Sequence, residues 1–204
     1  MRIANISRIA LAVALLSASA KPQVIEYENN GQKYQTLTRN GLTVIVTHMP
    51  NQIAGFAMMQ VSVANGSQIY WTVKPEEFSY EKTGSTPLNA MPANTVINQL
   101  LAKASHGDVV KLVKSYESAL YGIPNMRSTN GYEERRQSAL SMGASAKLQA
   151  AAMASAIALA TTRVPPGQST DGAVFFPVSR ELKTLSGGKL TLRVEGETFE
   201  FNPE

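Results

Sequence analysis

The chain has 204 residues, a formal net charge of +4 and no cysteine. Without cysteine, a disulfide framework and a lipid anchor attached to cysteine are both excluded. The basic residues are scattered, and only Arg135 and Arg136 are adjacent. Because proteins that bind nucleic acid carry a basic patch or stripe, we expect no nucleic-acid partner.

The first 20 residues have the layout of a secretory signal peptide. Two arginines are followed by an apolar run over 9–16, and Ala18 and Ala20 occupy the small-residue positions before a cleavage site. The apolar run is shorter than the roughly 20 residues that span a bilayer. We predict cleavage after Ala20, so that the exported protein, periplasmic or secreted, begins at Lys21 and forms one domain over 21–204.

Short strands are predicted before residue 85. Asn-Gly pairs at 30–31 and 40–41 tolerate positive φ and are typical of hairpin turns. Apolar and polar residues alternate between these turns and the following ones, which predicts an antiparallel sheet. The expected strands are 24–28, 33–38, 42–47, 56–64, 69–73 and a short strand that begins at Phe78.

Residues 85–163 follow a different pattern and predict a helical insertion. After a loop with two prolines, apolar residues recur every three or four positions, which is the helical period. We expect Gly107 to end the first helix and Asp108 to cap the second. Residues 132–162 predict one long helix, or two helices broken near Gly143.

The segment 148–162 is apolar or small on every side. A helix of this composition is expected to be buried on several sides. Lys147 and Arg163 flank it, and the 15 residues between them are too few to span a bilayer. We therefore expect no transmembrane segment in the mature chain.

Strand patterns return after the insertion. Residues 173–176 predict a compact apolar strand, and residues 190–201 predict a hairpin that turns at Glu195-Gly196. Both strand blocks have an apolar face to bury, and pairing them in one sandwich satisfies both. The predicted fold is mainly β, an antiparallel β-sandwich interrupted by a helical segment.

Three segments resemble a known group of proteins. They are Val61–Ser67 (VSVANGS), Phe78–Gly84 (FSYEKTG) and Pro166–Pro177 (PGQSTDGAVFFP). They are similar to exported bacterial immunoglobulin-like domains, a group that includes the telokin-like exported antigens. In that group a short loop joins the pieces that the helices separate here. The resemblance implies an extracytoplasmic immunoglobulin-like sandwich without shared catalytic residues.

Possible catalytic and metal-binding residues are few. Ser105, His106 and Asp108 lie close in sequence, whereas the members of a catalytic triad usually converge from separate segments. Zinc requires closely spaced Cys or His, and the pairs Glu76-Glu77 and Glu133-Glu134 point their side chains apart. We interpret these pairs as a solvated turn and the first turn of a helix, and we predict no enzymatic activity, cofactor or metal.

Three further motifs allow two interpretations each. Asn65-Gly66-Ser67 fits a glycosylation acceptor but is more simply a turn. Ser186–Lys189 is faintly similar to a phosphate loop but precedes a strand instead of a helix. In the Tyr70-Trp71 pair one ring should face the core and the other the solvent, where it could anchor a ligand.

Two functions remain open. The first is a non-enzymatic envelope or secreted module that binds another macromolecule, whose identity the sequence does not indicate. The second is a carrier of a small apolar molecule between the helices and the sheet, with Met142, Met153 and Ile157 lining the cleft. A hydrolase would require a deep pocket with convergent polar groups.

Overall fold

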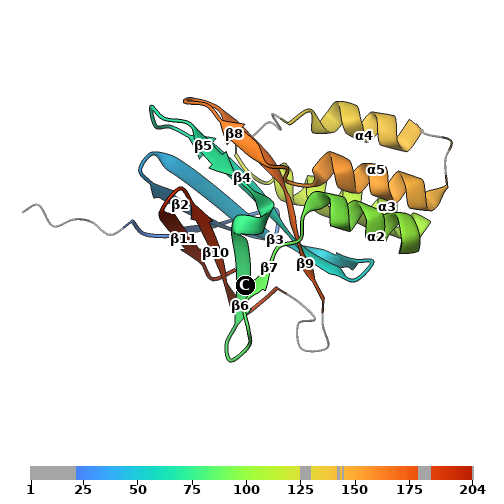
Figure 1. The fold of residues 1–204 in the computed structure, drawn as a ribbon, viewed down its shortest axis with the longest axis horizontal. Helices are drawn as coiled ribbons and strands as arrows, with labels where there is room; N and C mark the ends of the chain where they lie inside the picture. The colour runs from blue at the N-terminus through green and yellow to red at the C-terminus, as the bar shows by residue number, and fades with distance from the viewer. Residues whose placement is uncertain (1–21, 125–129, 142, 144, 179–184, 204) are drawn as a thin grey trace, which may run out of the picture.

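A computed structural model describes residues 22–124, 130–141, 143, 145–178 and 185–203. The predicted signal peptide and the predicted start at Lys21 lie outside these residues. The described chain consists mainly of antiparallel sheets, with four helices between two blocks of strands (Figure 1). The coarse prediction of a β-rich fold with a helical segment is therefore confirmed.

The larger sheet contains strands from both sides of the helical segment. Asn30 and Gly31 both have positive φ, as do Asn40 and Gly41, so the two predicted Asn-Gly hairpin turns are present. The last pair in this sheet joins residues far apart in the chain, with Ser62 opposite Asp171. In spatial order the strands are β1 (Ile25–Asn29), β2 (Gln32–Arg39), β3 (Leu42–Ile53), β4 (Phe56–Asn65) and β9 (Ser169–Pro177).

The smaller sheet contains the predicted carboxy-terminal hairpin, with Glu195 and Gly196 at positive φ in its turn. Its strands in spatial order are β11 (Glu197–Phe201), β10 (Gly188–Val194), β6 (Phe78–Lys82) and β7 (Leu88–Asn89). A separate ribbon pairs β5 (Trp71–Val73) with β8 (Thr162–Val164), and the short 3-10 helix η1 (Pro75–Glu77) precedes β6.

Five strand predictions need correction. β9 covers Ser169–Pro177 and is longer than the expected strand at 173–176, and β8 at Thr162–Val164 lies where the end of the helical insertion was expected. β3 continues to Ile53, past the expected end at residue 47, and its register with β4 shifts between Met49 and Ile53. Pro50 lies within this irregularity, where the missing N–H costs no ladder hydrogen bond. β5 is shorter than expected. The proline-containing loop before the helices holds the short strand β7.

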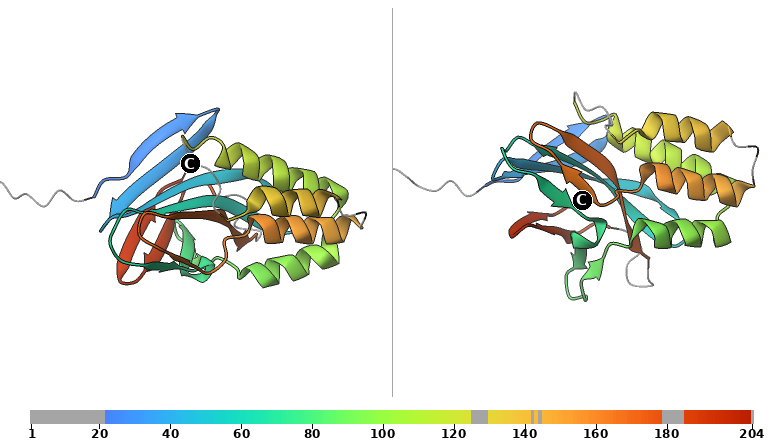
Figure 2. Two further views of the ribbon diagram at one scale, coloured as in Figure 1. Left: turned by 90° about the horizontal axis from the view of Figure 1, so that it is seen from above. Right: turned by 45° about the horizontal axis from the view of Figure 1, so that its top comes forward.

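The helices are α2 (Ala93–Lys103), α3 (His106–Leu120), α4 (Tyr132–Ser141) and α5 (Ala146–Ile157). Of the two alternatives for 132–162, two helices with a break near Gly143 is confirmed, but the second helix ends at Ile157 and not at residue 162. The expected role of Gly107 is wrong, because Gly107 lies in the first turn of α3. Figures 1 and 2 show the four helices gathered on one side of the molecule, away from β10 and β11.

Strand alternation places the two hydrophobic cores on opposite faces of the larger sheet. Along β4, Met59 and Val61 point towards the smaller sheet and belong to the inter-sheet core, the cluster shared by the two sheets. Phe56 and Met58 point the other way and belong to the helix–sheet core, the cluster shared with the helices. Because both of its faces are covered, β4 is buried almost throughout.

The helices bury the faces that contact the sheet and one another. In α2 the buried residues are Val96 and Leu100, whereas Leu101 is 40% exposed. α5 packs against α2, α3 and α4, and small residues such as Ala150 and Ala154 allow this close approach. Among the described residues, no helix combines the length and apolar character needed to cross a membrane.

Candidate functional site

The Ser105–Asp108 segment forms the start of α3. The Ser105 backbone N–H and Oγ–H both donate to Asp108 Oδ2, each at 2.7 Å, in a capping box. The expectation that Asp108 caps α3 is therefore wrong: Ser105 is the capping residue, and Asp108 accepts from it at the third helical position. The polar side chains of this motif are used to begin a helix.

The Asn65–Ser67 segment is a turn with a buried asparagine. Asn65 Nδ2 donates to the carbonyls of Ile69, at 2.7 Å, and Val164, at 3.0 Å. Asn65 Oδ1 accepts from the Ser67 backbone N–H at 2.9 Å and from its hydroxyl at 2.6 Å. Since this amide is only 2% exposed, the turn interpretation accounts for it better than a glycosylation site does.

The acidic pairs lie where the sequence places them. Glu77 is in η1 and accepts from the Lys74 backbone N–H, while Glu133 and Glu134 are in the first turn of α4. Lys189, the last residue of the weak phosphate-loop motif, lies in β10. It forms a salt bridge with a glutamate of the neighbouring strand β11. Within the described ranges, no three His, Asp or Glu side chains are arranged to hold a metal ion.

The residues expected to line an apolar cleft are packed inside the molecule. Met153 and Ile157, on α5, are both 0% exposed in the helix–sheet core. Met142 lies outside the described residues. An apolar ligand between the helices and the sheet would have to displace these packed side chains.

The Tyr70-Trp71 pair faces both ways, as predicted. Trp71 is 3% exposed and donates from Nε1 to Ser67 Oγ at 2.9 Å. Tyr70 is 48% exposed, and the Arg163 guanidinium lies 4.0 Å from the centre of its ring. The exposed ring therefore belongs to a cation–π pair on the outer face of the β5–β8 ribbon.

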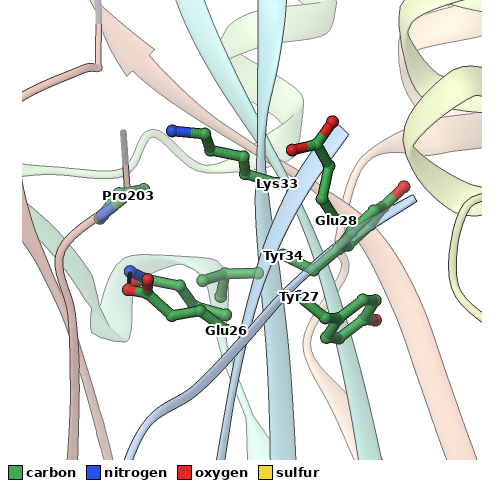
Figure 3. A pocket seen from close by; sticks show the side chains of 8 residues that line it. Glu26, Tyr27, Glu28, Lys33, Tyr34 and Pro203 are labelled. Atoms are coloured by element: carbon green, nitrogen blue, oxygen red, sulfur yellow. Dashed lines mark hydrogen bonds between the residues drawn. The ribbon is translucent and has the colours of Figure 1, made fainter. Parts of the chain in front are cut away.

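A first hollow, of about 210 Å³, lies beside β1, the outer strand of the larger sheet. Figure 3 shows Glu26 and Lys33 directed towards the side of Pro203, with Tyr27 and Tyr34 on the other side. We call it the edge hollow, and it is lined by Glu26, Tyr27, Glu28, Lys33, Tyr34, Gln35, Val46 and Pro203.

Interactions within the protein use the Tyr34 hydroxyl and the Gln35 amide nitrogen of the edge hollow. Tyr34 stacks on Tyr27, with ring centres 5.0 Å apart, and its hydroxyl donates to the Ala119 carbonyl at 2.8 Å. Burial, together with the neighbouring Tyr27, raises the pKa of Tyr34 to about 12. Gln35 Nε2 donates to Glu26 Oε1 at 2.5 Å and to the Asn202 carbonyl at 2.9 Å. These contacts join β1 and β2 to α3 and to the carboxy-terminal segment, which is a structural role.

A second hollow, of about 330 Å³, lies where the helices meet the β8 and β9 strands. We call it the seam hollow. Its walls come from the chain that follows α5, from β8, from the turn into β9, and from Asn130 and Arg135 beside the start of α4. The lining residues are Asn130, Arg135, Ala158, Ala160, Thr162, Arg163, Val164, Pro165, Gln168, Ser169, Thr170 and Asp171.

A backbone crossing forms one wall of the seam hollow. After α5 the chain runs alongside β9, where Ala158 and Ala173 form a parallel bridge and the Leu159 N–H donates to the Ala173 carbonyl at 2.9 Å. A Cβ on Gly172 would lie 2.5 Å from Leu159 Cα, so only glycine permits this approach. The crossing brings residues 158–163 beside the start of β9.

Asp171, on the floor of the seam hollow, is a buried carboxylate with 1% exposure. Its Oδ2 accepts from the Tyr116 hydroxyl of α3, and Asn130 Nδ2 donates to the Asp171 backbone carbonyl at 2.7 Å. Burial and the Asp171 charge both raise the pKa of Tyr116, so this hydroxyl remains a donor.

The buried carboxylate belongs to a network that joins β9, α3 and α4. The rings of Tyr116 and Tyr132 lie 4.8 Å apart, and the Tyr132 hydroxyl donates to Glu117 Oε1 at 3.2 Å. Arg136 Nε lies 2.6 Å from the same Glu117 oxygen. This network is buried at Asp171 and Tyr116 and partly exposed at Glu117 and Arg136, and it holds the wall of the hollow in one arrangement.

The rim of the seam hollow is cationic. Arg135 and Arg163 are both exposed. Arg135 donates to the backbone carbonyls of Asn130, at 2.6 Å, and Ser155, at 3.4 Å. Within the described part of the chain, neither guanidinium forms a salt bridge with an acidic side chain. The rim therefore presents two guanidinium charges that no described acidic side chain neutralises by direct contact.

No protein-family model and no curated protein matches the chain. A solved structure, the crystal structure of the yjhA protein from Bacillus subtilis, aligns with a TM-score of 0.37 and 6% identity. The alignment covers 88% of this chain and 96% of that one. A TM-score this low supports no argument about fold or function.

Strand alternation is the one sequence signal that points to the floor of the seam hollow. Alternation puts Asp171 on the same strand face as Ala173 and Phe175, and the structure shows that this face is buried in the helix–sheet core. A buried acid needs donors, but the sequence does not show that Tyr116 and Asn130 supply them. In the sequence Arg135 belongs to an adjacent basic pair and Arg163 flanks the apolar segment, and neither feature indicates a binding site.

Proposed function

We propose that the protein is an exported, non-enzymatic immunoglobulin-like module that binds another macromolecule in the envelope or outside the cell through the seam hollow. The resemblance of Val61–Ser67, Phe78–Gly84 and Pro166–Pro177 to exported immunoglobulin-like domains supports the domain type. Two antiparallel sheets with a shared core agree with it. The signal-like layout of the first 20 residues supports export.

The observation that carries the binding function is the contrast between the two kinds of surface in the helical segment. Its apolar face is used internally, with Met153 and Ile157 fully buried. Its junction with the sheet is an open hollow whose arginines have no acidic partner among the described residues. An apolar carrier requires the opposite arrangement, an unfilled apolar interior and a closed rim.

A hydrolase would need a nucleophile, a base and an orienting group within hydrogen-bond reach. The chain has two histidines, His48 in β3 and His106 at the start of α3, and neither lines the seam hollow. The floor carboxylate of Asp171 accepts from Tyr116, and this interaction occupies it within the fold. These arrangements favour binding over catalysis.

Export is tested by amino-terminal sequencing of the protein recovered outside the cytoplasm. We expect the sequence to begin at Lys21. Recovery of a chain that begins at Met1 from a membrane fraction would contradict the proposal.

Binding is tested by co-sedimentation of the processed protein with purified envelope material from the producing cells. We expect the protein to sediment with this material, Arg163→Gln to weaken the interaction, and Arg193→Gln to leave it unchanged. Arg193 is an exposed β10 arginine that does not line the seam hollow, so it controls for the loss of one charge. Equal sedimentation of both variants would place the binding surface elsewhere.

Native mass spectrometry of the purified protein separates the module from the carrier. A binding module should show the mass of the polypeptide alone. A retained lipid-like molecule that is lost in a variant of the helix–sheet core would favour the carrier instead.

A further inference from the structure

The seam hollow has chemistry that selects a class of ligand. Arg135 and Arg163 stand at its exposed rim. Apart from the Asp171 carboxylate at the floor, its other polar side chains are neutral hydroxyls and amides, including Thr162, Gln168 and Ser169. Arginine presents a planar fork of donors that matches a carboxylate or phosphate in two parallel hydrogen bonds. Neutral hydroxyl and amide groups suit ligand hydroxyls.

Arg163 is held in a geometry that suits such binding. Its guanidinium carbon lies over the Tyr70 ring, 4.0 Å from the ring centre, in a cation–π contact. This contact forms no hydrogen bond with the N–H donors of the guanidinium fork. Tyr70 therefore orients Arg163 without using its hydrogen-bonding capacity.

The negative charge of Asp171 does not exclude an anion from the rim. Its carboxylate is buried at the floor, where the Tyr116 hydroxyl donates to Oδ2 and the Asn130 amide lies 3.5 Å from the same oxygen. The two guanidinium groups are exposed at the opening. A ligand with a charged group at one end and hydroxyls at the other would place the charge at the rim and the hydroxyls towards the floor.

We infer that the seam hollow binds a hydroxylated oxyanion, the acidic sugar unit of an envelope polysaccharide. This inference rests on the proposed function and adds the class of its ligand. A hollow of about 330 Å³ suits one ring-sized unit of a polymer. The scattered basic residues of the chain do not form the extended stripe that a polyphosphate backbone needs.

The test is a titration of the processed protein with a short oligosaccharide of glucuronate or galacturonate, followed by calorimetry. Trp71, the single tryptophan, lies opposite Val164 of the hollow and provides a second signal by fluorescence. We expect the acidic oligosaccharide to bind and a neutral oligosaccharide of equal length to show no binding. Binding should weaken with added salt, because the charges at the rim are exposed.

Variants show whether the guanidinium fork is responsible. Arg163→Gln should weaken binding by about tenfold or more, as expected for loss of a charge-assisted hydrogen bond. Arg163→Lys keeps the charge without the fork and should lie between the parent and Arg163→Gln. Arg193→Gln should bind as the parent does. All three variants are judged only after thermal unfolding shows that each remains folded.

Several results would overturn the inference. They are equal binding of neutral and acidic oligosaccharides, unchanged binding by Arg163→Gln, or preferential binding of a phosphorylated sugar or an acidic peptide over the uronate. Envelope binding without uronate binding would refute the ligand class and leave the proposed function standing. Uronate binding without envelope binding would support the site chemistry and refute the proposed function.

Discussion

The inter-sheet core and the helix–sheet core share the larger sheet but are built in different ways. The inter-sheet core contains branched and aromatic strand residues such as Val61, Val63 and Phe176. The helix–sheet core depends on small residues in α5, and the Tyr116–Asp171 pair lies at its margin. Strand alternation alone specifies which residues form the inter-sheet core. The helix–sheet core also requires close packing of the helices and hydrogen-bond donors for the buried charge of Asp171. The seam hollow lies at the margin of the helix–sheet core.

The largest expected effect is on the helix–sheet core. Ile157→Asp should destabilise the protein by about 4 kcal/mol, because it buries an unpaired charge at a fully buried position. Urea denaturation measures the loss. Trp71 fluorescence and helical circular dichroism should report one coincident transition, since both cores share the strands β4 and β9.

The matched control for that variant is on the same helix. Leu148 is 41% exposed on α5, so Leu148→Asp should change stability by no more than about 0.5 kcal/mol. Similar losses for the two variants would show that the inner face of α5 is open to solvent. Two separate transitions would show that the cores fold independently.

A smaller loss of stability is expected when the Tyr116–Asp171 hydrogen bond is removed. Tyr116→Phe should cost about 1.5–3 kcal/mol, the usual value of a hydrogen bond to a charged group, because Asp171 loses a buried donor. In the double variant with Asp171→Asn, the two losses should not add, since they remove one interaction. Tyr121→Phe, at an exposed tyrosine just after α3, is the control. Additive losses would contradict a direct pair.

The close approach between β9 and the chain that follows α5 can be tested by adding one methyl group. Gly172→Ala should cost about 1–3 kcal/mol, because the new Cβ would meet the backbone of Leu159. It should also weaken uronate binding, since the crossing forms a wall of the seam hollow. Gly143→Ala, where a Cβ has open space, should have little effect in thermal unfolding. A stable Gly172→Ala variant would show that the two segments can separate easily.

The smallest effect concerns acid stability. Burial lowers the pKa of His48 from its ordinary value of 6.5. As the pH falls through 6.5, the unfolded chain binds this proton more readily than the folded protein, so stability is lost. His48→Gln should therefore reduce the fall in unfolding temperature between neutral and mildly acidic pH. An identical fall in the parent and the variant would contradict this assignment.

Local features of the fold could be predicted because near neighbours encode them. The turns at Asn30-Gly31 and Asn40-Gly41 follow from tolerance of positive φ, and the 190–201 hairpin follows from alternation. The end of β3 could not be predicted in this way, because Pro50 is a strand breaker unless a register irregularity accommodates it. Local alternation also predicts that one ring of the Tyr70-Trp71 pair is buried and the other exposed, as the structure shows.

The sequence by itself determined the order of strands, helices and strands, and the apolar character of α5. Only the tertiary structure decided that β4 pairs with β9, β5 with β8 and β6 with β10 across the helices. The β5–β8 pairing brings Arg163 beside Tyr70, and packing of α3 against the larger sheet brings Tyr116 to Asp171. Together these contacts create the seam hollow. The physical reason is that periodicity specifies which face of a segment is buried, whereas the partner of that face depends on contacts between residues distant in the chain.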